Sequence, residues 1–226
     1  MKIIVAVRCY NESKNVERLV RGYDFADEIL VSDGGSSDDS VEKLSKYPKV
    51  RIIHFSQFEE KEGLRWNPDN PHINFLLDEA KRSDPDIIIY DDFDNVPNYL
   101  LRDNARDILE KCDKPQVNAF RLYMWGDTSY FPYMNRDFDP AYRSLWAWKP
   151  REINIRADET LRHGSIIGTT PQDFLPIELP MCLLHKSWHP DTVDAKISKY
   201  KLFGIDMGHP LTEYGNPIAL PEYAHE

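Results

Sequence analysis

Short apolar runs alternate with amphipathic segments through the first half of the chain. The run from Lys2 to Val7 is rich in β-branched residues and predicts a strand, and apolar residues then recur at helical spacing as far as Tyr23. The same two signals repeat further along. Strands are predicted at residues 2–7, 28–32, 50–55, 86–90 and 117–123, and helices at about 16–23, 71–82, 98–111 and 191–203.

This alternation predicts an α/β fold with a mostly parallel sheet that is flanked by helices on both faces. In such sheets, ligands bind outside the carboxyl ends of the strands. Polar clusters follow the first, second and fourth predicted strands, so we expect these clusters to meet at one edge. A further short helix is predicted after Asp39, because an acceptor side chain followed three residues later by Glu42 can satisfy free N–H groups at a helix start.

The pattern is less regular beyond residue 123, where aromatic residues crowd among prolines and charged residues. We expect most of these aromatic side chains to form core and one or two to contact a ligand. The segment after Gly204 is rich in proline and glycine and is predicted to be a tail that wraps the domain. The aromatic residues of this segment are Trp125, Tyr130, Phe131, Tyr133, Phe138, Tyr142, Trp146 and Trp148.

Composition narrows the class of protein. The 226 residues are 41% hydrophobic and 29% charged, which is typical of a single compact domain and excludes disorder. A net charge of -10 argues against a broad basic surface that would bind nucleic acid. The sequence has no apolar stretch of about 18 residues and does not start with a signal peptide, so we expect a cytoplasmic protein without an integral membrane segment. Its cysteines lack metal-binding spacing and are expected to be reduced.

The sharpest chemical signal is the pair Asp92 and Asp94 at the end of the fourth predicted strand. Two carboxylates that flank one residue can converge on a hard divalent cation that also binds phosphate oxygens. Such pairs also occur by chance as solvated loop residues. Their place at the carboxyl end of a strand favours the metal-binding interpretation.

A second signal is the turn that begins at Asp33. Its Gly34 lets the backbone approach a ligand, and the Asp33 carboxylate can accept hydrogen bonds from a base or a ribose. The alternative is an ordinary capped polar turn, since Gly, Ser and Asp are common turn residues. Neither GxGxxG nor GxxxxGK[ST] is present, which argues against a dehydrogenase or a P-loop enzyme.

Three segments in this order, VRCYNE at 7–12, DGGSSD at 33–38 and DFDNVP at 92–97, resemble the family 2 glycosyltransferases of the GT-A fold, a single Rossmann-like domain. The resemblance covers roughly the first 125 residues. It implies a nucleotide-sugar-binding half at about 1–123 and an acceptor-binding half with a C-terminal tail at about 124–226. Arg8 departs from the family, which commonly has proline there, and Gly35 replaces the usual serine.

The resemblance also implies roles for individual residues. Tyr10, Asn11 and Glu12 line the donor pocket, and Asp33 and Gly34 belong to the turn that contacts the base, for which uridine is the commonest choice. Asp92 and Asp94 hold Mn²⁺ or Mg²⁺ on the diphosphate, and Asp92 also lies against the nucleotide. Some relatives supply a late histidine as a further metal ligand. The candidate here is His185, with Lys186 beside it as a possible phosphate contact.

The catalytic base is predicted from the acidic residues of the second half. Inverting transfer needs one carboxylate near the acceptor hydroxyl. Our candidates are Asp158 and Glu159, which resemble the family's acidic pair in reversed order, and Asp127, Asp137 and Asp173 remain open.

We therefore expect a metal-dependent hexosyltransferase-like enzyme that uses a nucleotide-diphosphate sugar, with inversion implied by the resemblance alone. The acceptor stays open among a glycan, a lipid-linked glycan, a protein and a modified nucleobase. One alternative is a sugar-phosphate nucleotidyltransferase, although the basic Gly-rich loop of those enzymes is missing near Arg8 and Lys14. Another is a noncatalytic nucleotide-binding module of the same fold.

Overall fold

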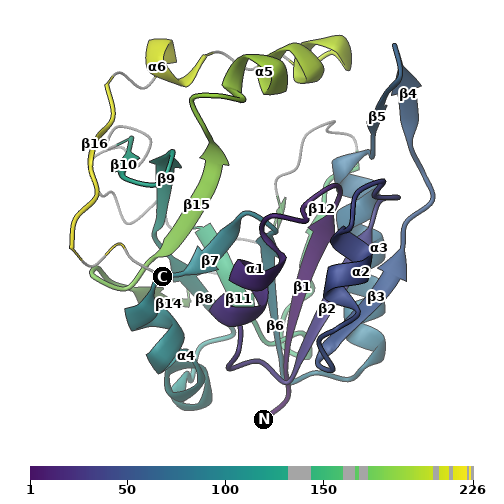
Figure 1. Cartoon of the computed structure of the whole chain (residues 1–226). Coiled ribbons are helices and arrows are strands. Elements are labelled where there is room, and N and C mark those ends of the chain that lie inside the picture. The colour runs from purple at the N-terminus through teal and green to yellow at the C-terminus, as the bar shows by residue number, and fades with distance from the viewer. Residues whose placement is uncertain are drawn as a thin grey trace.

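A computed structural model describes residues 1–131, 144–159, 166–167, 173–205, 209–213, 216–222 and 224 of the chain. Its central feature is a seven-stranded sheet (Figure 1). The strand order is β14 (Phe174–Ile177), β8 (Gln116–Ala119), β11 (Ser144–Trp148), β6 (Ile87–Asp92), β1 (Ile3–Cys9), β2 (Glu28–Asp33) and β3 (Val50–His54). Only β11 runs antiparallel to its neighbours. The predicted α/β fold with a mostly parallel sheet is confirmed.

The continuous apolar runs of the central strands reflect burial on both faces of the sheet. In β1, Ile3, Val5 and Val7 pack into one core together with residues of α1 (Val16–Gly22) and α4 (Tyr99–Lys111). Ile4 and Ala6 point to the opposite face and pack against α3 (Asp69–Arg82). The twofold alternation of side chains along a strand thus places helices on both sides.

A second sheet, of five strands, stands beside the first (Figure 1). Its strand order is β16 (Ile218–Ala219), β10 (Ser129–Tyr130), β9 (Arg121–Trp125), β15 (Leu183–Trp188) and β7 (Asn95–Pro97). The tail after Gly204 contributes α6 (Pro210–Glu213) and β16, which pairs with β10. Two-stranded ribbons form from β4 (Glu59–Lys61) with β5 (Leu64–Trp66) and from β12 (Arg156–Ala157) with β13 (Ile166–Ile167).

The prediction of one strand at 117–123 is wrong, because the chain changes sheets at Phe120. β8 belongs to the seven-stranded sheet and β9 to the five-stranded sheet. The carbonyl of Phe120 accepts a hydrogen bond from the Leu183 N–H at 2.7 Å, which directs the following residues onto β15. The side chain of Phe120 is buried against Leu122 and Leu184 rather than in the central sheet.

The helices follow the predicted periodicity, with α2 (Ser40–Leu44) and α5 (Val193–Leu202) completing the set already given. The predicted cap at the start of α2 is wrong. Asp38, not Asp39, accepts the Ser40 N–H, at 3.0 Å. Asp39 and Glu42 instead form ion pairs with lysines one turn later, at 3.1 and 3.0 Å, so neither forms the predicted capping box.

None of the helices in the described part of the chain is both long and apolar enough to span a membrane.

Candidate functional site

The carboxyl ends of β1, β2 and β6 lie side by side and bring the three predicted polar segments together. Arg8 of β1 is in register with Ser32 of β2 on one side and with Asp92 of β6 on the other. The loops that follow these strands therefore start from one edge of the sheet (Figure 1). This is the position where parallel α/β sheets bind ligands.

The loop after β1 is fastened to the turn after β2 by hydrogen bonds. Asn11 has a positive φ of 58°. Its N–H donates to the Ser36 hydroxyl at 2.9 Å, and its side-chain oxygen accepts the Ser37 N–H at 2.8 Å. The Glu12 N–H donates to Ser40 at 2.8 Å. Asn11 therefore joins two of the predicted donor-binding segments.

Asp33 directs its buried carboxylate into its own turn. It accepts hydrogen bonds from the Gly35 N–H at 2.9 Å, the Ser36 N–H at 3.1 Å and the Ser36 hydroxyl at 2.6 Å. His54 lies 3.6 Å from the same carboxylate. In this structure Asp33 holds the turn in shape, which matches the capped-turn alternative, and its contact with a base remains a prediction.

The β4–β5 ribbon and the segment after it cover the glycines of this turn. Asn67 donates to the Gly34 carbonyl at 3.1 Å, and a Cβ on Gly34 would collide with the Asn67 amide. Gly35 has a φ of +91°, and a Cβ there would lie 2.5 Å from the guanidinium of Arg65. The left-handed backbone at residue 35 favours glycine, which explains the departure from serine there.

Asp92, Asp94 and His185 form the candidate metal centre. One ligand atom of each lies within 4.8 Å of the ligand atoms of the other two. Asp92 ends β6, whereas His185 lies in β15, where it is paired in register with Asn95 of β7. Two carboxylates and an imidazole suit Mn²⁺ or Mg²⁺, with Mn²⁺ favoured by the nitrogen ligand. The donor set therefore fits the ion that the sequence predicts.

Burial sets the protonation states around this centre. It lowers the pKa of His185 to about 4, so the imidazole is neutral at pH 7 and keeps a lone pair for a metal. Burial opposes ionisation of Asp94, but nearby basic groups outweigh it and lower the Asp94 pKa. Burial raises the pKa of Glu12 to about 7, and the charge of Asp94 acts in the same direction.

Arg8 is part of the site, a role that its departure from the family pattern did not predict. Its guanidinium contacts Asp69 at 2.5 Å and Asp92 at 3.2 Å, and Nε donates to the Tyr90 hydroxyl at 3.1 Å. The sequence signal for this role was a basic residue near the end of one predicted strand and an acidic residue at the end of another. The structure shows that the two are in register. Arg8 thus places a fixed positive charge beside a predicted metal ligand.

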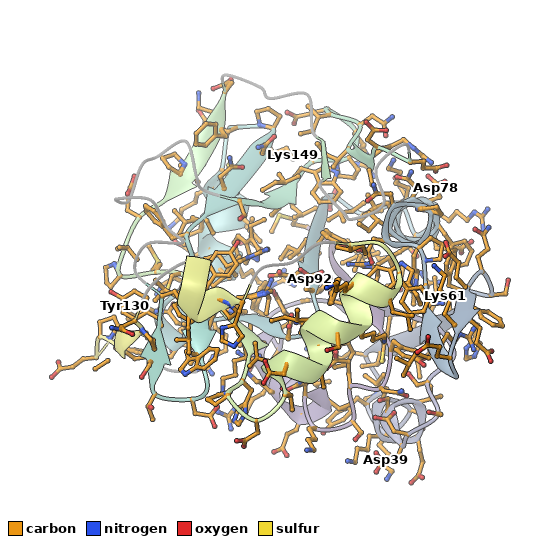
Figure 2. The ribbon with its side chains drawn as sticks, turned by 90° about the horizontal axis from the view of Figure 1, so that it is seen from above. Asp39, Lys61, Asp78, Asp92, Tyr130 and Lys149 are labelled. Atoms are coloured by element: carbon orange, nitrogen blue, oxygen red, sulfur yellow. The ribbon has the colours of Figure 1, made fainter. Side chains whose placement is uncertain are left out.

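Helix α5 crosses the same edge of the sheet and adds further basic side chains. In Figure 2, which looks down on this edge, α5 passes over the part of the fold where Asp92 is labelled. Lys196 acts electrostatically on Asp94, and the Lys199 ammonium lies 4.9 Å from the centre of the Tyr10 ring. Trp66 of β5 packs against Tyr200 at a ring separation of 5.1 Å. The sequence predicted this helix at about 191–203 but not its location above the site.

The predicted catalytic bases lie at the side of the site, against α3. The carbonyl of Asp158 accepts a hydrogen bond from Asn70, which adjoins the Arg8 partner Asp69. The Glu159 carboxylate accepts from Asn74 at 2.7 Å. These contacts tie both residues to α3, and their role as base stays a prediction.

The remaining candidates for the catalytic base are Asp127, Asp173 and Asp137. Asp127 forms an ion pair with Lys186 at 3.1 Å, which also occupies the lysine predicted to meet a phosphate. Asp173 pairs with Lys114 at 2.6 Å, next to the first residues of β14 and β8. That is the amino-end edge of the sheet, opposite the site, so Asp173 cannot serve as the base. Asp137 lies outside the described residues.

Most described aromatic residues of the second half are core, as predicted. Phe131, Trp146 and Trp148 are fully buried and Tyr130 is buried, whereas Trp125 is half-buried. Tyr133, Phe138 and Tyr142 lie outside the described residues.

Comparisons with known proteins agree with this geometry. Residues 4–65 match the model of the family described as glycosyl transferase family 2. A search of curated proteins finds no match. Among solved structures, residues 1–349 of S. aureus TarS align with a TM-score of 0.55 and 15% identity, over 92% of this chain and 67% of that chain.

Two further structures share the fold. A longer TarS structure aligns with a TM-score of 0.54 and 16% identity, over 89% of this chain. This chain spans only 38% of that TarS chain. Glucosyl-3-phosphoglycerate synthase from Mycobacterium tuberculosis, in complex with Mn²⁺, UDP and phosphoglyceric acid, aligns with a TM-score of 0.51 and 14% identity, over 97% of this chain and 87% of that chain. The sequence match over residues 4–65 and the shared fold confirm the resemblance: this chain has the GT-A fold of the family 2 glycosyltransferases.

Proposed function

We propose that this protein is a metal-dependent glycosyltransferase that moves a sugar from a nucleotide-diphosphate donor, a UDP-sugar, to an acceptor hydroxyl with inversion. The observation that carries the proposal is the convergence of Asp92, Asp94 and His185 beside the turn that begins at Asp33. The presence of Mn²⁺ and UDP in the mycobacterial synthase structure supports the choice of metal and base.

Different residues at the carboxyl ends of these strands bind different parts of the donor. The joined loops around Asn11 and Asp33 offer the surface for the nucleoside, with Tyr10 at its margin under Lys199. Asp92, Asp94 and His185 hold the divalent cation, which when bound supplies positive charge to the diphosphate. The cationic side chains of Arg8 and α5 add to the positive field in which the leaving group develops its charge.

The proposed transfer is a single displacement. A carboxylate, with Asp158 and Glu159 as the candidates, takes the proton of the acceptor hydroxyl. The acceptor oxygen forms a bond to the anomeric carbon as the bond from that carbon to the diphosphate oxygen breaks. The nucleoside diphosphate leaves with the electron pair. Attack from the face opposite the leaving group inverts the anomeric configuration.

Calorimetric titration of the full chain with UDP and with GDP, with and without Mn²⁺, tests the donor site. We expect UDP to bind with Mn²⁺ and to lose that binding in Asp94→Asn. Asp107→Asn is the matched control, because Asp107 is an exposed carboxylate on α4 paired with Lys111. If neither nucleoside diphosphate binds in the presence of Mn²⁺, the proposal fails.

A second measurement tests the reaction itself. Release of UDP from UDP-sugars would support transfer, and the anomeric configuration of the product by NMR would report inversion or retention. Release of pyrophosphate from a nucleoside triphosphate and a sugar phosphate would instead identify a nucleotidyltransferase. Metal-dependent UDP binding without release of either product from any donor would point to a noncatalytic module.

A further inference from the structure

A cluster of polar side chains adjoins the candidate metal centre and has no role in the proposed sugar transfer. It consists of Tyr23 at the end of α1, Asp91 in β6, Asn95 in β7 and Arg121 in β9. Tyr23, Asp91 and Asn95 are each 0% exposed. Burial of polar and charged groups is costly unless every one is paired, so this cluster calls for an explanation beyond packing.

The Asp91 carboxylate acts only as a hydrogen-bond acceptor. Its Oδ1 receives the Asp92 N–H at 3.0 Å and the Arg121 guanidinium at 3.2 Å, and both of these groups can only donate. The Asn95 side-chain nitrogen lies 2.5 Å from the same oxygen. Asp91 therefore fixes the orientation of the Asn95 amide, since the opposite orientation would place two oxygens against each other.

The fixed amide then faces His185. With its nitrogen on Asp91, Asn95 presents its oxygen to Nδ1 of the imidazole, with which it is in hydrogen-bond contact. An amide oxygen can only accept, so Nδ1 must carry the proton. In the neutral ring this leaves the lone pair on Nε2. Asp94 Oδ1 lies 3.8 Å from the same Nδ1, beyond hydrogen-bond distance, and the described residues form no hydrogen bond or ion pair with Nε2, whose lone pair stays available to a metal ion.

The backbone holds the two partners opposite each other. Asn95 and His185 are register partners in the antiparallel β7–β15 pair. Arg18 of α1 crosslinks the same two segments, because its guanidinium donates to the Asp94 carbonyl at 2.8 Å and to the Leu184 carbonyl at 3.0 Å. The contact between amide and imidazole thus rests on a rigid frame.

We propose that Asn95 is a positioning residue that fixes the tautomer and orientation of His185 for metal binding, with Asp91 as its anchor. The inference rests on the proposed metal centre. A hydrogen bond to the far nitrogen of a ligating histidine commonly fixes the ring, and loss of such partners lowers metal affinity about 10- to 100-fold. An amide is suited to this place because it donates to a carboxylate and accepts from an imidazole at once.

Calorimetric titration of the full chain with Mn²⁺ in the presence of UDP tests the proposal. Asn95→Leu keeps the size of the side chain and removes both hydrogen bonds, and we expect Mn²⁺ affinity to fall about 10- to 100-fold. Tyr23→Phe is the matched control, because it removes the 2.6 Å hydrogen bond to Asp91 from the same buried cluster but leaves Asn95 and His185 in contact. Its Mn²⁺ affinity should stay within about twofold of the wild type.

Two further readouts separate positioning from general support of the fold. In a His185→Ala background, Asn95→Leu should cause no additional loss of Mn²⁺ affinity, because its effect passes through the imidazole. Nitrogen-15 NMR of the histidines should show the Nδ1–H tautomer of His185 in the wild type and its loss in Asn95→Leu. Equal losses of affinity in Tyr23→Phe and Asn95→Leu, or additive losses in the double variant, would overturn the proposal. Failure of the wild type to bind Mn²⁺ would instead refute the metal centre itself.

Discussion

Replacement of Arg8 by methionine is expected to lower the stability of the protein while tightening its hold on a divalent cation. Arg8 contacts Asp69 at 2.5 Å and Asp92 at 3.2 Å. The substitution keeps much of the apolar stem and removes the charge. Asp69, only 6% exposed, loses an ion-pair partner, whereas Asp92 is more open to solvent.

The magnitude follows from the burial of the two carboxylates. Removal of one partner of a buried ion pair costs about 3 to 5 kcal/mol, and we expect about 3 kcal/mol because Arg8 is itself partly exposed. For a domain of this size, that corresponds to a fall in Tm of about 6 to 12 °C. The pair with Asp92 is worth up to about 1 kcal/mol, since the Asp92 carboxylate is partly solvated. Its loss frees Asp92 for a cation and should lower the Kd for Mn²⁺ up to about fivefold.

Differential scanning calorimetry measures the first effect and Mn²⁺ titration the second. Arg82→Met is the control, because Arg82 is exposed on α3 and pairs with Glu79 on the same helix. Its Tm should change by at most about 2 °C. A variant at Arg8 that melts within about 2 °C of the wild type, or that binds Mn²⁺ more weakly, would refute this account of the charge balance.

Three further outcomes are expected from particular contacts. Gly22→Ala should lower the free energy of unfolding in urea by about 1 to 3 kcal/mol, because the new Cβ would lie 2.8 Å from Cβ of Val96; an unchanged midpoint would mean that α1 shifts freely. Burial lowers the pKa of His72 from 6.5 to about 3, so the unfolded chain takes up a proton below pH 6.5 that the folded chain does not. Acidification from pH 7 to 5 should therefore cost the wild type about 2 kcal/mol more stability than His72→Gln, and equal losses in urea titrations would contradict this. Burial raises the pKa of Cys9 and of Cys182 to about 12, so both thiols should resist iodoacetamide at pH 8 in the native protein and react after unfolding, as measured by mass spectrometry.

The central sheet could be predicted because its strands are buried on both faces and read as continuous apolar runs. The change of sheet at Phe120 could not, since apolar residues continue through it and only the hydrogen bond from Leu183 shows where β8 ends. The cap of α2 failed for a related reason. Asp38 and Asp39 are both suitable acceptors, and the tertiary contact with Ser13 at 3.1 Å draws Asp38 into that place.

The grouping of Asp92, Asp94 and His185 was predicted more completely than its surroundings. Asp92 and Asp94 are separated by a single residue at the end of a predicted strand, and the resemblance to the family implied His185 as a third ligand. The positions of Arg8 and α5 depend on how distant elements pack, which local periodicity does not encode. Asp173 was retained as a candidate because nothing in its neighbours reveals which edge of the sheet it occupies.

The candidate metal centre takes its residues from both sheets, since Asp92 ends a strand of the seven-stranded sheet and His185 lies in the five-stranded sheet. In the proposed metal-bound state, the ion would therefore link the seven-stranded sheet to the five-stranded sheet. At a free concentration one hundred times its Kd, a ligand of the native state adds about 2.7 kcal/mol to stability. Part of that free energy would resist separation of the two sheets, so a bound ion would also stabilise the position of the five-stranded sheet against the seven-stranded sheet.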